Sequence, residues 1–207
     1  MENFPTESKR IVIAVTGASG IIYAQRLLSQ LLNYDVEIYC IVSNAAKEIL
    51  KAEIIGAPDI KQALRKIVEN QNISKIDKIK FFDEDNFFAP CASGSFNFDA
   101  MAIVPCSMKT LGKIANSIAD NLIVRAAEVA LKERRRLVVV PRETPLALTQ
   151  LRNMCALAEA GAIVMGASPA FYTNPQSIED LADFIVARIL SCMGFKQKIL
   201  KEWGDEK

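Results

Sequence analysis

The sequence contains no histidine among its 207 residues. This absence excludes Ser-His-Asp and Cys-His catalysis and most zinc sites, because each depends on an imidazole. Acid–base chemistry must therefore come from glutamate, aspartate, lysine, tyrosine or cysteine. The five cysteines include no C-x-x-C pair, and such an odd, unpaired set is typical of a reducing cytosol. We therefore expect a cytoplasmic protein without a metal site.

An excess of charge of either sign is also missing. Lysine and arginine number 25 and aspartate and glutamate 24, which leaves a formal net charge of +1. Nothing in this balance indicates nucleic acid or a membrane surface as a partner. No apolar run reaches the length of a membrane span, and no signal peptide opens the chain.

Hydrophobic residues make up 51% of the chain, which is enough for a sizeable core. The length predicts one domain over residues 1–207, with a loose lead at 1–9 and a tail at 195–207. Short β-branched runs alternate with helical patterns, which predicts a three-layer α/β sandwich with a doubly wound, mostly parallel sheet of flavodoxin or Rossmann type. The predicted strands are 11–15, 36–42, 78–81, 101–105, 137–140 and 162–165. The predicted helices are 21–32, 44–52, 60–69, 111–118, 121–134, 148–160 and 177–193.

The first strand runs into the small residues TGASG, from Thr16 to Gly20, and then into a helix. This order forms an anion site, because free N–H groups of the first turn and the helix dipole both point at an arriving phosphate. The G-x-x-G spacing is not the dinucleotide fingerprint, and no acidic residue ends the second strand. A mononucleotide therefore fits better than a dinucleotide, and the alternative is a tight turn without a ligand.

Two other strands end in hydroxyl residues. Ser43 follows strand 36–42, and Ser107 with Thr110 follows strand 101–105. Each hydroxyl can either cap the next helix or contact a ligand at the carboxyl edge of the sheet. Two such elements in one sheet favour a shared anionic ligand.

The segment PRETPL at 141–146 gives the sharpest chemical signal. Two prolines restrict the backbone around Arg142 and Glu143, at the edge where open α/β sheets bind ligands. In a chain without histidine, Glu143 is the best placed acid–base candidate. The alternative is that Glu143 only forms a salt bridge.

Three cations lie in or beside predicted apolar stripes. Arg125 and Lys132 share a helix face, where they either extend to solvent or bind an anion. Arg188 falls in the apolar stripe of the last helix, where a buried or half-buried guanidinium needs an anionic partner. Tyr172 lies in the loop just before that helix.

The irregular segment 82–95 contains Phe87 and Phe88. A long loop with aromatic residues is often a lid or an interface. The alternative is that both rings fill the core, and the sequence leaves the choice open.

Six motifs together resemble the flavin prenyltransferases of the UbiX type. They are TGASG, SGS at 93–95, PCSMKTLGKIA at 105–115, DNLIVRAAEVALKERR at 120–135, PRETPL, and the Tyr172/Arg188 pair. The resemblance extends from about Arg10 to Trp203. It implies a flavodoxin-like, metal-free homo-oligomer, typically a dodecamer, with sites at subunit interfaces. It also implies transfer of the dimethylallyl group of dimethylallyl phosphate to N5 and C6 of reduced FMN, which gives prenylated FMN for a UbiD-type decarboxylase.

The resemblance also implies residue roles. The FMN site would contain Gly17, Ala18, Ser19, Ser43, Ser107, Met108, Lys109, Thr110, Arg125 and Arg142. The phosphate of the prenyl donor would be held by Lys132, Arg142, Tyr172 and Arg188, a clamp suited to a dianion. Glu143 would be the acid–base residue, Lys132 and Arg142 would assist catalysis, and Glu53 matches an acidic position near the flavin.

The departures from the family pattern are small: Asn44 and Ile54 replace a common lysine and threonine. Two alternatives are weighed against this function. Flavin-dependent cysteine decarboxylases resemble this fold but use a histidine base, which is missing here. A non-enzymatic FMN carrier would not need a second phosphate clamp. Which decarboxylase and which pathway are served stays open.

Overall fold

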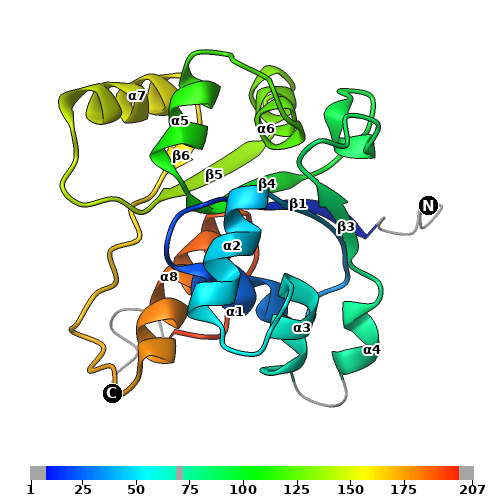
Figure 1. Cartoon of the computed structure of the whole chain (residues 1–207), viewed down its shortest axis with the longest axis vertical. Coiled ribbons are helices and arrows are strands. Elements are labelled where there is room, and N and C mark those ends of the chain that lie inside the picture. The colour runs from blue at the N-terminus through cyan, green and yellow to red at the C-terminus, as the bar shows by residue number, and fades with distance from the viewer. Residues whose placement is uncertain (1–7, 69–71, 201–207) are drawn as a thin grey trace, which may run out of the picture.

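The computed structural model describes residues 8–68 and 72–200, and these form a six-stranded parallel sheet between two layers of helices (Figure 1). The strands are β1 (Lys9–Val15), β2 (Val36–Val42), β3 (Lys80–Asp83), β4 (Ala100–Cys106), β5 (Arg136–Pro141) and β6 (Ile163–Val164). Their order is β3-β2-β1-β4-β5-β6, and each neighbouring pair is parallel. The predicted doubly wound α/β fold is confirmed, and the strand order is the Rossmann order.

The helices are α1 (Ile21–Leu31), α2 (Asn44–Glu53), α3 (Ile60–Arg65), α4 (Ile73–Ile76), the 3-10 turn η2 (Pro90–Ala92), α5 (Met108–Ala115), α6 (Leu122–Lys132), α7 (Leu148–Glu159) and α8 (Ile178–Cys192). In Figure 1, α1, α2, α3 and α8 lie on one side of the sheet and α5, α6 and α7 on the other. Successive side chains of β1 pack alternately against the two helix layers, because the side chains of a strand point to alternate faces of the sheet. Ile11 and Ile13 pack with the first layer, whereas Val12 and Ala14 pack with the second.

Side-chain caps mark the starts of several helices. Ser107 caps α5 by accepting the N–H of Thr110, so this helix begins three residues before the predicted position 111. Asn121 and Ser177 cap α6 and α8 in the same way. β3 lies two residues later than predicted, and α3 ends at Arg65 instead of 69, a residue outside the described part of the chain.

The predicted loose lead and tail lie mostly outside the described residues. Their described parts pack on the domain: Lys9 begins β1, and Phe195 is buried with its ring centroid 4.9 Å from that of Tyr34. Within residues 8–68 and 72–200, no helix combines the length and apolar character needed to span a membrane.

Candidate active site

The carboxyl ends of β1 and β4 meet where the strand order reverses, and Thr16 joins them. Its hydroxyl donates to the carbonyl oxygen of Pro105 at 2.8 Å and accepts the N–H of Ser107 at 2.7 Å. Thr16 is completely buried, so this hydroxyl fixes the glycine turn after β1 against the start of α5. Open α/β sheets bind ligands at such a point.

The turn from Gly17 to Gly20 requires both glycines. A Cβ on Gly17 would lie 2.4 Å from the Cβ of Ala45, so no side chain fits between the turn and α2. Gly20 has a φ of +110°, a left-handed conformation that other residues rarely adopt. Between them, Ala18 is buried and Ser19 is exposed. The backbone here is shaped for close approach, as the sequence predicts.

The first amides of α1 are already occupied by Glu53, the last residue of α2. Its carboxylate accepts the N–H of Gly20 at 3.0 Å and that of Ile21 at 2.8 Å. The positive end of the helix dipole stabilises a carboxylate at this position. The prediction that these amides are free for a phosphate is therefore wrong, although Glu53 does lie beside the turn as expected.

Arg142 reaches from the end of β5 to the same turn. Its Nε donates to the carbonyl oxygen of Ser19 at 3.1 Å, while its two Nη groups make no hydrogen bond or ion pair with the described residues. The positive charge of Arg142 also acts on Tyr23: burial raises the pKa of that phenol, and the guanidinium partly opposes the rise. Arg142 thus has the four N–H donors of its two Nη groups available beside the turn.

Glu143 follows Arg142 at the rim of a cavity of about 180 Å³. Its carboxylate is exposed and accepts the N–H of Thr144 at 3.1 Å. Among the described residues it forms no salt bridge, so the alternative of a structural ion pair finds no support. The cavity is lined by Pro141, Arg142, Glu143, Thr144, Leu146, Met154, Gly166, Ala167 and Ser168.

Both predicted hydroxyl sites act as helix caps. Ser43 is buried, and its Oγ accepts the N–H of Ala46 at 3.0 Å. Ser107 and Thr110 lie 3.0 Å apart between their hydroxyl oxygens at the start of α5. Lys109 is exposed in the first turn of this helix. Capping and ligand contact were predicted as alternatives, and the observed capping leaves ligand contact as a prediction.

Arg125 and Lys132 lie at different ends of α6. Arg125, in the first turn, donates from Nε to the carbonyl oxygen of Ala92 at 3.0 Å. Lys132 is the last residue of the helix, is exposed, and lies 3.6 Å from Glu133. It therefore precedes β5, whereas Arg142 follows the end of that six-residue strand. A strand rises about 3.3 Å per residue. Lys132 therefore lies near the amino ends of the strands, and Arg142 lies near their carboxyl ends.

Arg188 is exposed, which corrects the prediction of a buried or half-buried guanidinium. The buried face of α8 contains Ala182, Ile185, Val186 and Ile189, and Arg188 points away from it. Tyr172 is 66% exposed, with its ring centroid 6.1 Å from that of Phe184. The participation of Arg188 and Tyr172 in a phosphate clamp stays a prediction.

The aromatic loop between β3 and β4 does not fill the core. Phe88 is fully exposed and Phe87 is 46% exposed, which excludes the core alternative. Two residues beside the site have no predicted role: Thr16, which binds the N–H of Ser107, and Glu84, which binds the N–H of Asn44. Thr16 belongs to the TGASG motif, whereas nothing in the sequence around Glu84 distinguishes it from its acidic neighbours.

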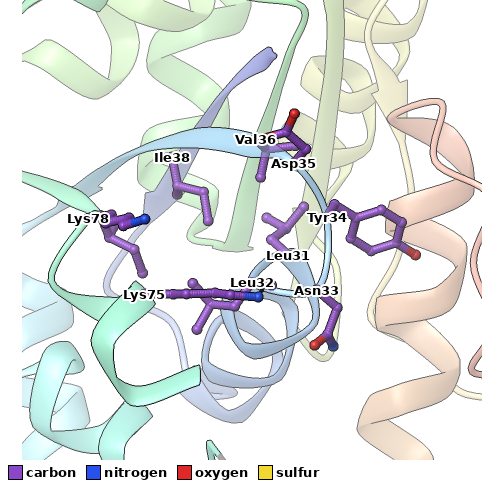
Figure 2. A pocket seen from close by; sticks show the side chains of 10 residues that line it. Leu31, Leu32, Asn33, Tyr34, Asp35, Val36, Ile38, Lys75 and Lys78 are labelled. Atoms are coloured by element: carbon purple, nitrogen blue, oxygen red, sulfur yellow. Dashed lines mark hydrogen bonds between the residues drawn. The ribbon is translucent and has the colours of Figure 1, made fainter. Parts of the chain in front are cut away.

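Another hollow, of about 340 Å³, lies where α1 ends and β2 begins, at the amino ends of the strands. Figure 2 shows Lys75 and Lys78 beside Leu31 and Ile38 in this hollow. None of the predicted site residues lines it. Across the described ranges no group of three or more acidic, cysteine or histidine residues could hold a metal ion.

Comparison with known proteins assigns the chain as a whole to a family. The family model described as Flavoprotein matches residues 2–190. The flavin prenyltransferase UbiX of Methanocaldococcus jannaschii is 44% identical, with 94% of this chain and 98% of that protein covered. The UbiX protein of Pseudomonas aeruginosa is 43% identical over 96% of this chain and 95% of its own length. The chain belongs to the UbiX flavin prenyltransferase family.

Solved structures agree with this membership. AnUbiX (PadA1), crystallised with FMN and dimethylallyl pyrophosphate, has a TM-score of 0.84 at 37% identity and covers 97% of this chain and 100% of its own. A structure described as a dodecameric FMN-dependent UbiX-like decarboxylase from Escherichia coli O157:H7 has a TM-score of 0.79 at 34% identity. The match covers 91% of this chain and 96% of that one. The peptidyl-cysteine decarboxylase EpiD, at 18% identity, shares the fold alone.

Proposed function

We propose that this UbiX-family chain transfers the dimethylallyl group of dimethylallyl phosphate to N5 and C6 of reduced FMN. The observation that carries the proposal is the meeting of three elements at one sheet edge: the glycine turn, the hydroxyl-rich start of α5, and Arg142 with Glu143. The absence of histidine and a second set of cations favour this transferase over a cysteine decarboxylase or a flavin carrier.

The helix starts at this edge differ in what they could bind. Glu53 holds the first amides of α1, and Glu84 accepts the N–H of Asn44 at the start of α2. The start of α5 instead offers the hydroxyls of Ser107 and Thr110 with Lys109, and no acidic residue lies in its first turn. An anion is stabilised at such a terminus. We therefore assign the phosphate of FMN to α5, and the flavin side to the turn 17–19.

When bound, reduced FMN supplies the two ring atoms that receive the prenyl group. The chain supplies the rest: the Nη groups of Arg142 bind the donor phosphate and stabilise its negative charge as its bond to carbon breaks. Glu143, at the cavity rim, accepts and returns protons at this edge. The apolar parts of the cavity exclude water from the allylic group.

The clamp is completed by a neighbouring subunit. Lys132 and Arg142 lie near opposite edges of one chain, and Arg188 and Tyr172 are exposed. These residues can share one phosphate if copies of the chain associate, and the UbiX-like protein of Escherichia coli O157:H7 is dodecameric. We propose a homo-oligomer, a dodecamer, with the site at an interface. A cytoplasmic location and delivery of prenylated FMN to a UbiD-type decarboxylase are parts of the same proposal.

The test is anaerobic incubation of the protein with reduced FMN and each donor, dimethylallyl phosphate or dimethylallyl pyrophosphate, followed by mass analysis of the flavin. A mass gain of one five-carbon prenyl unit with the monophosphate is expected. A gain only with the pyrophosphate would reassign the donor, and an unchanged flavin with both would refute the transferase.

A further inference from the structure

Glu84 is the first residue after β3, and it contacts two helix starts at once. One carboxylate oxygen accepts the N–H of Asn44, the first residue of α2, at 2.7 Å. The other accepts from the side-chain amide of Asn121, the N-cap of α6, at 3.0 Å. The backbone carbonyl of Glu84 accepts the N–H of Leu122 at 2.7 Å. A single residue thus connects α2 to α6.

Each of these two helices carries a predicted FMN residue close to the Glu84 contact. On α2, the bonded N–H belongs to the peptide that joins Ser43 to Asn44. On α6, Asn121 also accepts the N–H of Val124, which precedes Arg125. Any shift of Glu84 is therefore passed to Ser43 and to Arg125 through one peptide and one helix turn.

The loop that follows Glu84 is fastened at its far end as well. Arg125 donates to the carbonyl oxygen of Ala92, and Arg135 donates to those of Gly94 and Phe96 at 2.8 and 2.7 Å. Glu84 holds the start of this loop through its hydrogen bonds to Asn44 and Asn121. Arg125 holds a later part of it through the carbonyl oxygen of Ala92. Both ends of the aromatic loop are thus hydrogen-bonded to the start of α6.

We propose that Glu84 is a positioning residue of the FMN site: its shared carboxylate sets the distance between Ser43 and Arg125. This inference rests on the proposed FMN binding. The bridge depends on side-chain length, because one carboxylate must reach both Asn44 and Asn121. Its charge alone, near the positive ends of two helix dipoles, would stabilise the fold without defining that distance.

Three substitutions separate length from charge. Glu84→Asp keeps the charge but shortens the side chain by one methylene. Glu84→Gln keeps the length and the acceptor for Asn44 but places a donor N–H against the side-chain amide of Asn121, which also donates. Glu84→Ala removes both the charge and the length. Glu48→Gln is the control, because Glu48 is an exposed residue of α2 that pairs, among the described residues, with Lys51 alone. FMN affinity is measured by fluorescence quenching, the environment of bound flavin by visible circular dichroism, and the melting temperature on the same FMN-free protein.

Glu84→Asp, Glu84→Gln and Glu84→Ala are all expected to weaken FMN binding at least tenfold and to change the visible circular dichroism, while the control Glu48→Gln stays within about threefold of wild type. Wild-type affinity for Glu84→Asp would overturn the positioning role, since charge alone would then suffice. A Glu84 variant with a lower melting temperature but unchanged FMN affinity and unchanged visible circular dichroism would also overturn the positioning role. If wild-type protein binds no FMN, the proposed function fails instead, whereas failure of this inference leaves wild-type binding intact.

Discussion

Arg142 donates a hydrogen bond from Nε to the carbonyl oxygen of Ser19 at 3.1 Å, across 123 residues of sequence. β4 lies between the two strands that carry these residues, so the side chain spans the central strand of the site. The bond orients the guanidinium and leaves its Nη groups for another acceptor. The glycine turn and the PRETPL segment are thereby two parts of one site.

Glu143→Gln is expected to preserve the fold and FMN binding but to slow prenyl transfer by about 10²–10⁴. Glutamine keeps the size of the side chain but cannot exchange a proton. Single-turnover kinetics with flavin mass analysis measures the rate, and an FMN titration measures binding. Near-normal turnover would show that Glu143 carries no proton, and loss of FMN binding would make its role structural.

Arg188→Ala is expected to raise the KM for the prenyl donor about 10- to 150-fold, the range that corresponds to a charged hydrogen bond of about 1.5–3 kcal/mol. FMN affinity should change little, because Arg188 is assigned to the donor phosphate. Arg152→Ala, an exposed arginine of α7 without an assigned role, is the matched control. An equal loss of affinity for FMN and for the donor would show that the assignment of Arg188 to the donor phosphate is wrong.

Hybrid oligomers are expected to recover activity that each parent lacks. Lys132→Ala and Glu143→Gln should both be inactive alone, since each removes one part of the site. If Lys132 serves a neighbouring subunit, a co-expressed mixture contains sites in which both residues are intact. Activity is measured on purified hybrids after differential tagging. Inactive hybrids of normal size would place both residues in one chain's site.

Gly17→Ala is expected to abolish FMN binding, because its new methyl group would lie 2.4 Å from the Cβ of Ala45. Adding Ala45→Gly removes that contact and should restore most of the affinity. Both variants and Ala45→Gly alone are compared by FMN titration. A double variant as weak as Gly17→Ala would mean that the turn needs glycine for a reason other than this contact.

Asp180 should contribute to stability only while it is ionised. The N–H groups of Gln176 and Ser177 lower the pKa of this carboxyl below its usual 3.8. A carboxyl group whose pKa is lower in the folded than in the unfolded protein stabilises the fold at pH values above its unfolded pKa. This contribution to stability is lost as the pH falls through the folded-state pKa. Asp180→Asn should therefore unfold more easily than wild type at pH 7, and the difference should shrink below about pH 4. Urea unfolding of both proteins at each pH measures the difference in stability. A difference that stays constant from pH 7 to pH 3 would contradict this prediction.

The strands and most helices follow from the sequence because their signals are local. Buried runs such as Leu137–Val140 need β-branched residues on both faces, and caps such as Ser177 lie next to the helices that they start. The carboxyl-edge location of Gly17, Ser107 and Glu143 follows as well, since parallel strands end at one edge. Their roles with FMN and donor stay predictions.

The remaining features depend on distant residues. Glu53 reaches Gly20 across 33 residues, and no local pattern indicates that contact. The error at Arg188 has a simpler cause: Leu181, used to define the stripe, is itself only half-buried, so the true buried face lies to one side. The separation of Lys132 from Arg142 becomes visible only when the strand between them is built.

The position of β1 makes the domain depend on its second half. β1 is synthesised first yet lies inside the sheet, with β2 and β3 on one side and β4, β5 and β6 on the other. A chain that ends after β3 would have half a sheet, with the apolar residues of β1 along an unpaired edge. Such edges recruit other chains and cause aggregation. The pairing of β4 with β1 therefore does two things: it covers the edge of β1, and it brings the glycine turn beside the start of α5.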